Sequence, residues 1–487
     1  MIEFEPVIGL EVHAEMLTES KMFCGCAVVD ATVAAPNDSV CEICTGMPGT
    51  LPVINRRAVE YALRVATALD CTIAETSVFA RKNYFYPDLP KGFQISQYEL
   101  PLARHGRLPI ETETGEKEIR IRRVHLEEDT GKLFHRNDYS LIDFNRSGVP
   151  LLEIVSEPDL RSVEEAYAYI TGLRRLLRYL EVNSGDMEKG VIRFEANVSL
   201  RPVDDEAFGT RVEIKNLNSF RAVTRSLEHE LERQRELLTR GESVTQATLG
   251  WDESKAITVV QRIKEQAEDY RYFPEPDLPP LVVSQDWISR VRLKIPELPH
   301  IKSQRFIEAY GLTEYTVGVL IEDRIIAEYF EAAAEATDAA PADKLANWLT
   351  GDYFALLNEA GISLEESLVP PDHLAELVDL VEAGTINATT AKEVLAEAFE
   401  SGESPAAIVA DRGLEQQGDP AVINKVLEDV LRENPEQLQE YLAGKEAVSQ
   451  WFFGQIMRAT KGQADPQVVR SVLTEKLAEI ASDVDTG

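Results

Sequence analysis

The sequence predicts an α+β protein in which a sheet-based domain is followed by an all-helical domain and a small helical tail domain. Up to about residue 295, segments that alternate between apolar and polar residues are mixed with helical patterns. Beyond that point the alternation fades, and segments rich in Ala, Glu and Leu follow. The last part contains three helix starts of one kind. The predicted domains are 1–295, 296–412 and 413–487.

The clearest strand patterns lie near the N-terminus and in the middle of the first domain. In the first pattern, one face carries apolar side chains and the other carries Glu11 and His13. The second pattern alternates in the same way and has Glu195 on its polar face. Half-buried strands alternate with this period of two. The segments predicted as strands are 7–13, 141–145, 191–200 and 210–215.

Two helices interrupt these strands. Ser162 and Glu165 form a capping-box pattern before apolar residues at helical spacing. The second helix carries apolar residues over 223–238 and ends at Gly241. Helices cannot run through the prolines that cluster over 273–280 and recur at 296 and 299, and we place the first domain boundary near 295.

A polar break at 411–413 indicates the second domain boundary. In the tail, Asp419, Asn434 and Asp465 each precede a proline. A capping residue before proline at the first helical position is typical of a helix start. We therefore expect a helix after each of the three.

The composition indicates a soluble protein. Hydrophobic residues make up 44% and charged residues 28% of the 487 residues. No apolar run approaches the roughly 18 residues that a membrane span needs, and the first residues do not resemble a signal peptide. We expect a cytoplasmic location. The net charge of −34 argues against a nucleic-acid partner, although a global charge does not exclude a local basic patch.

Four of the five cysteines form two close pairs, Cys24 with Cys26 and Cys41 with Cys44. Two pairs separated by a short loop are typical of a tetrahedral four-thiolate zinc site. Such a site is closed, so its role would be structural; a zinc hydrolase would need three protein ligands and an open position. The alternative is that the four cysteines are unrelated core residues.

Carboxylates gather on the polar faces of the predicted strands. Glu11 and His13 are two residues apart on one face, hence about 6–7 Å from each other. An acidic run, Glu127 to Asp129, follows His125, and Glu153 follows two leucines. The alternative is a hydrated sheet face, since antiparallel sheets commonly expose one face to water. As a set, these groups favour a divalent cation such as magnesium, which binds few carboxylates and substrate phosphates.

The sequence lacks the Gly-rich phosphate loop and the dinucleotide-binding glycine motif. Several longer phrases nevertheless resemble one family, the B subunits of glutamyl/aspartyl-tRNA amidotransferases. The B type is favoured over the related archaeal E type because the chain is short and has no large insertion before the tail. The phrases are VIGLEVH at 7–13, RKNYFYPD at 81–88, QISQ at 94–97, HLEED at 125–129, DFNRSGVPLLEIVSEPD at 143–159, VEIKNLNSFR at 212–221, DYRYFPEPDL at 269–278 and GQIMRATKG at 454–462.

The resemblance implies a cradle-shaped catalytic domain, a helical domain and a tail that binds tRNA. It also implies a heterotrimer with an amidase A subunit and a small C subunit. In that family the A subunit releases ammonia from glutamine. The B subunit uses ATP to phosphorylate the side-chain carboxylate of Glu-tRNA(Gln) or Asp-tRNA(Asn), and ammonia then displaces the phosphate. The sequence does not indicate which of the two tRNAs is the substrate.

By the same resemblance, a set of acidic residues and one histidine would form the magnesium and phosphate site. Glu195 departs from the family's phrase, which leads us to expect the shorter aspartate at this position. In the tail, basic residues would contact tRNA. The site residues are Glu11, His13, Glu127, Glu128, Glu153 and Glu195, and the tRNA contacts are Lys445, Arg458, Lys461 and Arg470.

A rival interpretation is a non-catalytic, tRNA-binding scaffold whose partner chains carry out the chemistry. A pure RNA binder should line its sheet with Lys, Arg and aromatic residues rather than with carboxylates. The carboxylate set therefore favours the catalytic interpretation.

Overall fold

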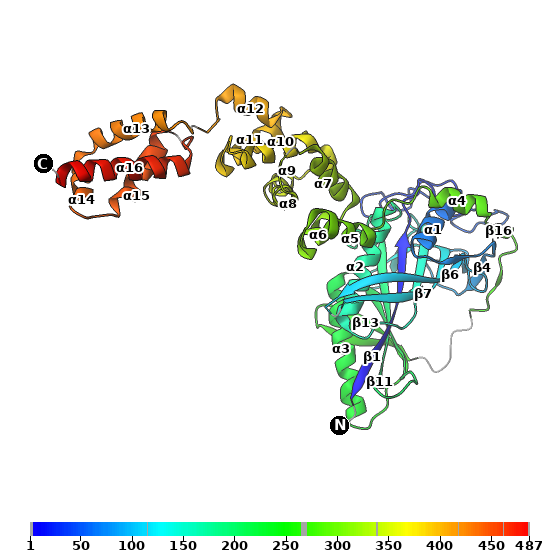
Figure 1. The fold of residues 1–487 in the computed structure, drawn as a ribbon. Coiled ribbons are helices and arrows are strands. Elements are labelled where there is room, and N and C mark those ends of the chain that lie inside the picture. Colours follow the sequence, from blue (N-terminus) through cyan, green and yellow to red (C-terminus); the bar gives the residue numbers. More distant parts are fainter. Residues whose placement is uncertain are drawn as a thin grey trace. The chain divides into compact units, whose positions relative to one another are not determined.

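The computed structural model describes residues 3–113, 115–263, 270–337, 339–416, 418–460 and 462–485. The chain divides into two compact units, Met1–Lys302 and Ser303–Gly487 (Figure 1). The first contains the strands and the second contains helices, so the predicted α+β class is confirmed. The three-domain division at 295 and 412 remains a prediction.

A nine-stranded sheet forms the centre of the first unit, and β1 lies in its middle. Every neighbouring pair in this sheet is antiparallel except β12 with β13, which is parallel. In spatial order the strands are β14 (Ile257–Ile263), β13 (Ala247–Asp252), β12 (Val212–Leu217), β11 (Ile192–Pro202), β1 (Phe4–Glu15), β10 (Pro150–Ser156), β7 (Gly115–Glu128), β6 (Ala103–Thr112) and β2 (Thr72–Ile73).

One face of this sheet is apolar and covered by helices. In β1 the buried residues Ile8, Leu10 and Val12 alternate with Glu11 and His13, as predicted. Helices α1 (Arg56–Ala68), α2 (Val163–Tyr179) and α3 (Phe220–Thr239) contact strands β7, β6 and β11, respectively. The side chains between helices and sheet form one hydrophobic core. The opposite face is left for the polar side chains.

Both predicted helices of the first unit are present. The Ser162 hydroxyl accepts a hydrogen bond from the backbone N–H of Glu165, as an N-cap should. The Glu165 carboxylate accepts from the backbone N–H of Arg161 at 2.6 Å rather than from that of Ser162, so the predicted capping box is only half formed. Gly241 follows α3 with a φ of +76°, a conformation that glycine adopts without strain.

Shorter strands form three smaller sheets in the described part of the first unit. The three-stranded sheet contains β15 (Phe273–Pro274), β4 (Ala80–Asn83) and β5 (Phe93–Ser96). Two further strand pairs are β16 (Leu281–Val282) with β3 (Thr76–Ser77), and β8 (Lys132–His135) with β9 (Ser140–Asp143). Helix α4 (Gln285–Arg292) follows the proline-rich segment.

The second unit contains two hydrophobic clusters, one formed by residues between 306 and 414 and one formed by residues between 423 and 480. Helix α5 (Pro299–Tyr310) begins shortly before this unit. The helices that follow are α6 (Glu314–Leu320), α7 (Arg324–Ala336), α8 (Ala342–Trp348), α9 (Phe354–Ala360), α10 (Pro371–Glu382), α11 (Ala388–Ser401), α12 (Pro405–Arg412), α13 (Pro420–Glu433), α14 (Pro435–Leu442), α15 (Val448–Ala459) and α16 (Pro466–Asp485), with a π-helical segment at Leu349–Tyr353 and a 3₁₀ turn at Leu364–Glu366.

The three predicted helix starts of the tail are all present. Asp419 and Asp465 accept hydrogen bonds from backbone N–H groups in the first turns of α13 and α16. Asn434 does not cap α14 with its side chain; its amide instead donates to the carbonyl of Val430 at 2.8 Å. Among the described residues, no helix combines the length and the apolar character that crossing a membrane requires.

Candidate active site and metal centre

The polar face of the large sheet brings His13, Glu153 and His125 into one row. Across the antiparallel pairs, His13 on β1 faces Glu153 on β10, and Glu153 faces His125 on β7. One carboxylate oxygen of Glu153 lies 3.3 Å from Nε2 of His13 and 3.2 Å from Nε2 of His125. The Nε2 atom of His125 also lies 2.8 Å from Oε1 of Glu127. The sheet register therefore links three strands through two imidazoles and two carboxylates.

Burial makes the charges of this row strongly interdependent. His125 is 1% exposed and Glu153 is 6% exposed. Burial alone would lower the pKa of His125, but the charges of Glu153 and Glu127 and the hydrogen bonds to them outweigh it and raise the pKa to about 9. The pKa of His13 is raised for the same reason, chiefly by Glu153 against the opposing effect of burial. Burial would raise the pKa of Glu153, but the two histidines hold it well below its usual range.

His13, Glu127 and Glu153 each offer one donor atom, and the three donors lie within 4.8 Å of one another. Octahedral magnesium with bonds of 2.0–2.1 Å needs donors about 3–4 Å apart, so a small closure would let the three bind one ion. Two carboxylates and one neutral imidazole leave positions for water or phosphate oxygens. These residues fit a magnesium ion.

Residues of β5 fix the two neighbouring glutamates at the end of β7. The amide of Gln94 donates to Glu127 at 3.0 Å, and the hydroxyl of Ser96 donates to the other oxygen of Glu127 at 2.8 Å. Glu128 accepts from the backbone N–H of Ile95 at 3.0 Å and pairs with Lys91. Glu128 is therefore close to the three-donor group but is held separately from it.

Glu11 and Glu195 face each other across β1 and β11. The amide of Asn197 donates to Glu11 at 3.1 Å, and burial together with the charges of Glu153 and Glu195 raises the pKa of Glu11. Lys215 donates to Glu195 at 2.5 Å. The glutamate at position 195 is thus neutralised by a lysine, and it does not belong to the three-donor group.

Sequence reasoning included His125 in the set that favours a divalent cation but gave it no role of its own, and it did not nominate Gln94, Ser96 or Lys82. For His125 a signal existed, because it precedes Glu127 by two residues and so shares its strand face. Lys82 is a further cation of this face. Burial lowers its pKa, but the charges of Glu127 and Glu153 outweigh this and raise it. Its ammonium lies 4.9 Å from the ring centroid of Tyr270.

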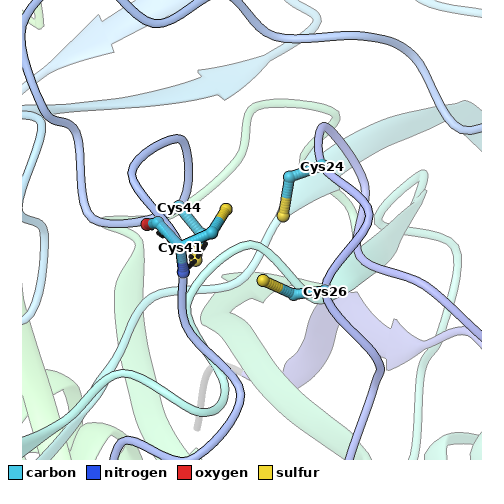
Figure 2. Close-up of side chains that lie close together, drawn as sticks. All are labelled: Cys24, Cys26, Cys41 and Cys44. Carbon is cyan, nitrogen blue, oxygen red and sulfur yellow. Dashed lines mark hydrogen bonds between the residues drawn. The ribbon is translucent and has the colours of Figure 1, made fainter.

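The four cysteines come together on two loops that precede α1. Figure 2 shows the sulfur atoms directed toward a common space, with Cys24 and Cys26 on one loop and Cys41 and Cys44 on the other. The four sulfurs lie within 4.8 Å of one another, and those of Cys41 and Cys44 are 3.9 Å apart. Tetrahedral zinc with bonds of about 2.3 Å requires sulfurs about 3.8 Å apart. The arrangement fits a closed, four-thiolate zinc site.

The electrostatics of the loops favour a thiolate at Cys44. The hydrogen bond from Cys24, with smaller contributions from the backbone of Cys41 and the charge of Lys21, overcomes burial and lowers the pKa of Cys44 to about 4. Burial and the neighbouring sulfurs raise the pKa of Cys26 to about 11. A bound metal would remove the remaining thiol protons, since only thiolates are zinc ligands.

The cysteine loops and the carboxylate face share a pocket of about 180 Å³. Cys24 and Cys44 line one part of it, and Lys91, Glu128 and Arg81 line another. Arg81 forms two hydrogen bonds of 2.7 Å with the buried carboxylate of Glu275. The zinc-type centre is therefore adjacent to the acidic site.

The basic residues predicted for the tail lie on its surface. Lys445 pairs with Glu440 at 3.3 Å, and Arg458 is exposed on α15. The guanidinium of Arg470 lies 5.2 Å from the ring centroid of Phe453 and lines a groove of about 340 Å³. Lys461 lies outside the described residues.

Comparisons with known proteins match nearly the whole chain. A family model described as the GatB/GatE catalytic domain matches residues 6–289, and one described as the GatB domain matches residues 328–477. Curated relatives named as the B subunit of aspartyl/glutamyl-tRNA(Asn/Gln) amidotransferase include one from Thermoanaerobacter sp. (strain X514), which is 48% identical over 479 residues, covering 98% of this chain and 100% of the relative. The relative from Persephonella marina is 48% identical over 476 residues, with the same coverage. The relative from Roseiflexus sp. (strain RS-1) is 50% identical over 482 residues, covering 98% of this chain and 99% of the relative.

Proposed function

Because this chain belongs to the family of aspartyl/glutamyl-tRNA(Asn/Gln) amidotransferase B subunits, we propose that it activates the acidic side chain of a mischarged tRNA with ATP. The γ-phosphoryl group of ATP passes to the side-chain carboxylate of Glu-tRNA(Gln), Asp-tRNA(Asn) or both, which gives an acyl phosphate and ADP. Ammonia then attacks the acyl carbon and phosphate leaves, which produces the amide. A free carboxylate is a poor electrophile, so this activation is the step that the chemistry needs.

In this proposal His13, Glu127 and Glu153 hold magnesium, which would offset the negative charge of ATP as it meets the substrate carboxylate. Their burial fixes them in place before substrate arrives. His13 must lose its proton to act as a ligand, whereas the low pKa of Glu153 keeps this carboxylate ionised. Glu128, held by Lys91 and the backbone of Ile95, borders the pocket beside the ion.

The other members of the acidic set have supporting roles in the proposal. Glu11 lies near enough to Glu153 for their charges to interact, so it would help to hold magnesium at the phosphate side of the site. Glu195, paired with Lys215, keeps that lysine in place at the edge of the row. Zinc at Cys24, Cys26, Cys41 and Cys44 would fix the two loops beside the pocket.

We further propose the heterotrimer that the sequence suggests. An amidase A subunit would release ammonia from glutamine, and a small C subunit would complete the complex in the cytoplasm. The tail residues Lys445, Arg458, Lys461 and Arg470 would contact tRNA phosphates. The groove that contains Arg470, Tyr441 and Phe453 has the cationic and aromatic groups that suit RNA.

The observation that carries the catalytic proposal is the three-donor group of half-buried His13 with buried Glu127 and Glu153. The test is to reconstitute the chain with A and C subunits and to measure ADP formation that depends on mischarged tRNA, amidation of the tRNA, and glutamine hydrolysis. Glu153→Gln should abolish the first two while glutamine hydrolysis by the A subunit continues. Glu118→Gln is a matched control, because Glu118 is an exposed glutamate on β7.

Two other outcomes would change the interpretation. If glutamine hydrolysis fell as much as activation, the variant would have broken the assembly rather than the site. If Glu153→Gln formed ADP and amidated tRNA at the wild-type rate, the three-donor group would have no part in the reaction.

A further inference from the structure

Lys21, which lies beside the cysteine loops, is completely buried, with an exposed fraction of 0%. Its ammonium lies 2.7 Å from the carbonyl oxygen of Ser39, 3.2 Å from that of Phe144 and 3.7 Å from Sγ of Cys44. A lysine ammonium has three N–H donors. The three acceptors therefore use all of them, and one acceptor is a sulfur of the cysteine cluster.

The enclosed ammonium lacks a carboxylate partner within the described part of the chain. The two carbonyl oxygens satisfy its hydrogen bonds but carry no net charge. A buried charge without a counter-ion is costly, and buried charges are therefore usually paired. Among the residues that the structure describes, the only group in contact with this ammonium that can carry a negative charge is the thiolate of Cys44.

The cysteine site has the opposite requirement. Four thiolates around one divalent cation carry a net charge of −2, which also needs compensation when the site is partly buried. Ligands of metal sites are commonly fixed by a second hydrogen-bonding partner behind them. Among the described residues, Cys44 has two such donors. The backbone N–H of Cys41 lies 3.2 Å from its sulfur, and the ammonium of Lys21, which carries a charge, lies 3.7 Å from it.

We propose that Lys21 is the counter-ion of a metal centre formed by Cys24, Cys26, Cys41 and Cys44, and that it orients Cys44 through an N–H···S hydrogen bond. The proposal rests on the zinc site of the proposed function and adds a positioning residue to it. Through Lys21 the centre gains one compensating charge and Cys44 is held in the geometry of a ligand.

Backbone contacts give Lys21 a second link to the site. Its own backbone N–H donates to the carbonyl of Cys26 at 2.9 Å, so this residue touches both cysteine loops. The hydroxyl of Ser147 donates to the carbonyl of Cys44 at 3.1 Å. A Cβ atom on Gly148 would lie 3.4 Å from Cβ of Cys44, 3.6 Å from Cδ of Lys21 and 3.9 Å from Oε2 of Glu128. The counter-ion is thus close to the catalytic pocket as well as to the metal ligands.

The test compares zinc affinity in the full chain. Lys21→Met keeps the length of the side chain but removes the charge and the donors, and Lys21→Gln keeps donors for the two carbonyls. Lys189→Met is the matched control, since Lys189 is an exposed lysine that pairs with Asp30 near the same loops. Competition with a chelating dye at fixed pH should show zinc affinity about 10–100-fold lower in both Lys21 variants and unchanged in the control.

A spectroscopic measurement separates positioning from general loosening of the fold. With cobalt in place of zinc, the thiolate-to-metal charge-transfer band should move to longer wavelength in the Lys21 variants, because a sulfur that has lost its charged N–H donor and keeps only that of Cys41 gives up its electrons more easily. Wild-type affinity together with an unchanged band in both variants would overturn the proposal and leave Lys21 as a donor to carbonyls only.

A measurement on the wild-type protein covers the case in which neither variant folds. With cadmium-113 in place of zinc and nitrogen-15 in the lysine side chains, the ammonium protons of Lys21 should show scalar coupling to the metal through the sulfur. A resolved Lys21 signal without that coupling would refute the hydrogen bond. A wild-type chain that binds no stoichiometric zinc would instead refute the zinc site of the proposed function, so the two failures are distinguishable.

Discussion

Glu153→Gln should lower the pKa of His125, because it removes a carboxylate charge that lies 3.2 Å from the imidazole. In the wild type the pKa of His125 is raised from 6.5 to about 9. A shift of this size corresponds to roughly 3 kcal/mol in favour of the imidazolium, at about 1.4 kcal/mol per unit. Because His125 is 1% exposed, water screens its interactions very little. Removing the charge of Glu153 leaves Glu127 as the only carboxylate in contact among the described residues, so the pKa should fall by more than a unit.

The same change has a consequence for stability. A histidine whose pKa is raised by folding stabilises the fold fully below its unfolded value near 6.5, and this stabilisation is lost as the pH rises toward about 9. Without added magnesium, the wild-type first unit should therefore become less stable between pH 6.5 and 9. Glu153→Gln should flatten this dependence.

The assay is nuclear magnetic resonance of carbon-13-labelled histidine rings, which follows each ring through its titration. The chain has 7 histidines, and a His125→Gln spectrum identifies the relevant signal. Glu118→Gln provides the control, since that side chain is exposed and pairs with Arg107 rather than with the row. A His125 pKa that stays within half a unit of the wild-type value in Glu153→Gln would refute the electrostatic account of the row.

Three other predictions concern metal and tRNA. Magnesium should bind more tightly as the pH rises from 7 to 9, because the raised pKa values of His13 and His125 make protons compete with the ion. Calorimetry in two buffers should detect the release of protons on binding. Binding that does not depend on pH would contradict this prediction. Cys24→Ala should reduce zinc from about one per chain to substoichiometric amounts and expose the cysteine loops to proteolysis, as elemental analysis and limited digestion would show. Deletion from residue 413 onward should weaken the binding of mischarged tRNA, and the share of the affinity that is lost should depend on salt, since phosphate contacts release counterions. If the shortened chain bound tRNA as tightly as the full chain at every salt concentration, the tail would not be a tRNA-binding domain.

The sequence was a good guide where the information is local. Alternation placed Glu11 and His13 on the polar face of β1, and the Asp-Pro pairs located the tail helices. The pairing of His13 with Glu153 was beyond local reasoning, because it depends on which strands are neighbours and on their register. The cysteine spacing indicated a cluster, and the structure brings the four sulfurs together.

Reasoning from local sequence fails where contacts between distant segments determine the position of a side chain. Glu127 and Glu128 are consecutive, so a strand places them on opposite faces, and only the contacts with β5 explain why both stay beside the site. Asn434 precedes a proline, which is typical of an N-cap, but its side-chain amide donates to the carbonyl of Val430 instead. Lys21 carried no signal at all, because its partners Ser39, Cys44 and Phe144 are all distant from it in the sequence.

The arrangement of one functional residue per strand has a consequence for folding. Side chains alternate with a period of two, so a slip of one residue between β1 and β10 or between β10 and β7 would turn a whole strand over. Such a slip would drive His13, Glu153 or His125 into the hydrophobic core and expose residues such as Leu152. The burial of charges would penalise every misaligned sheet. The residues proposed for magnesium therefore also act against misfolding, and substitutions that make them apolar should relax strand register as well as remove activity.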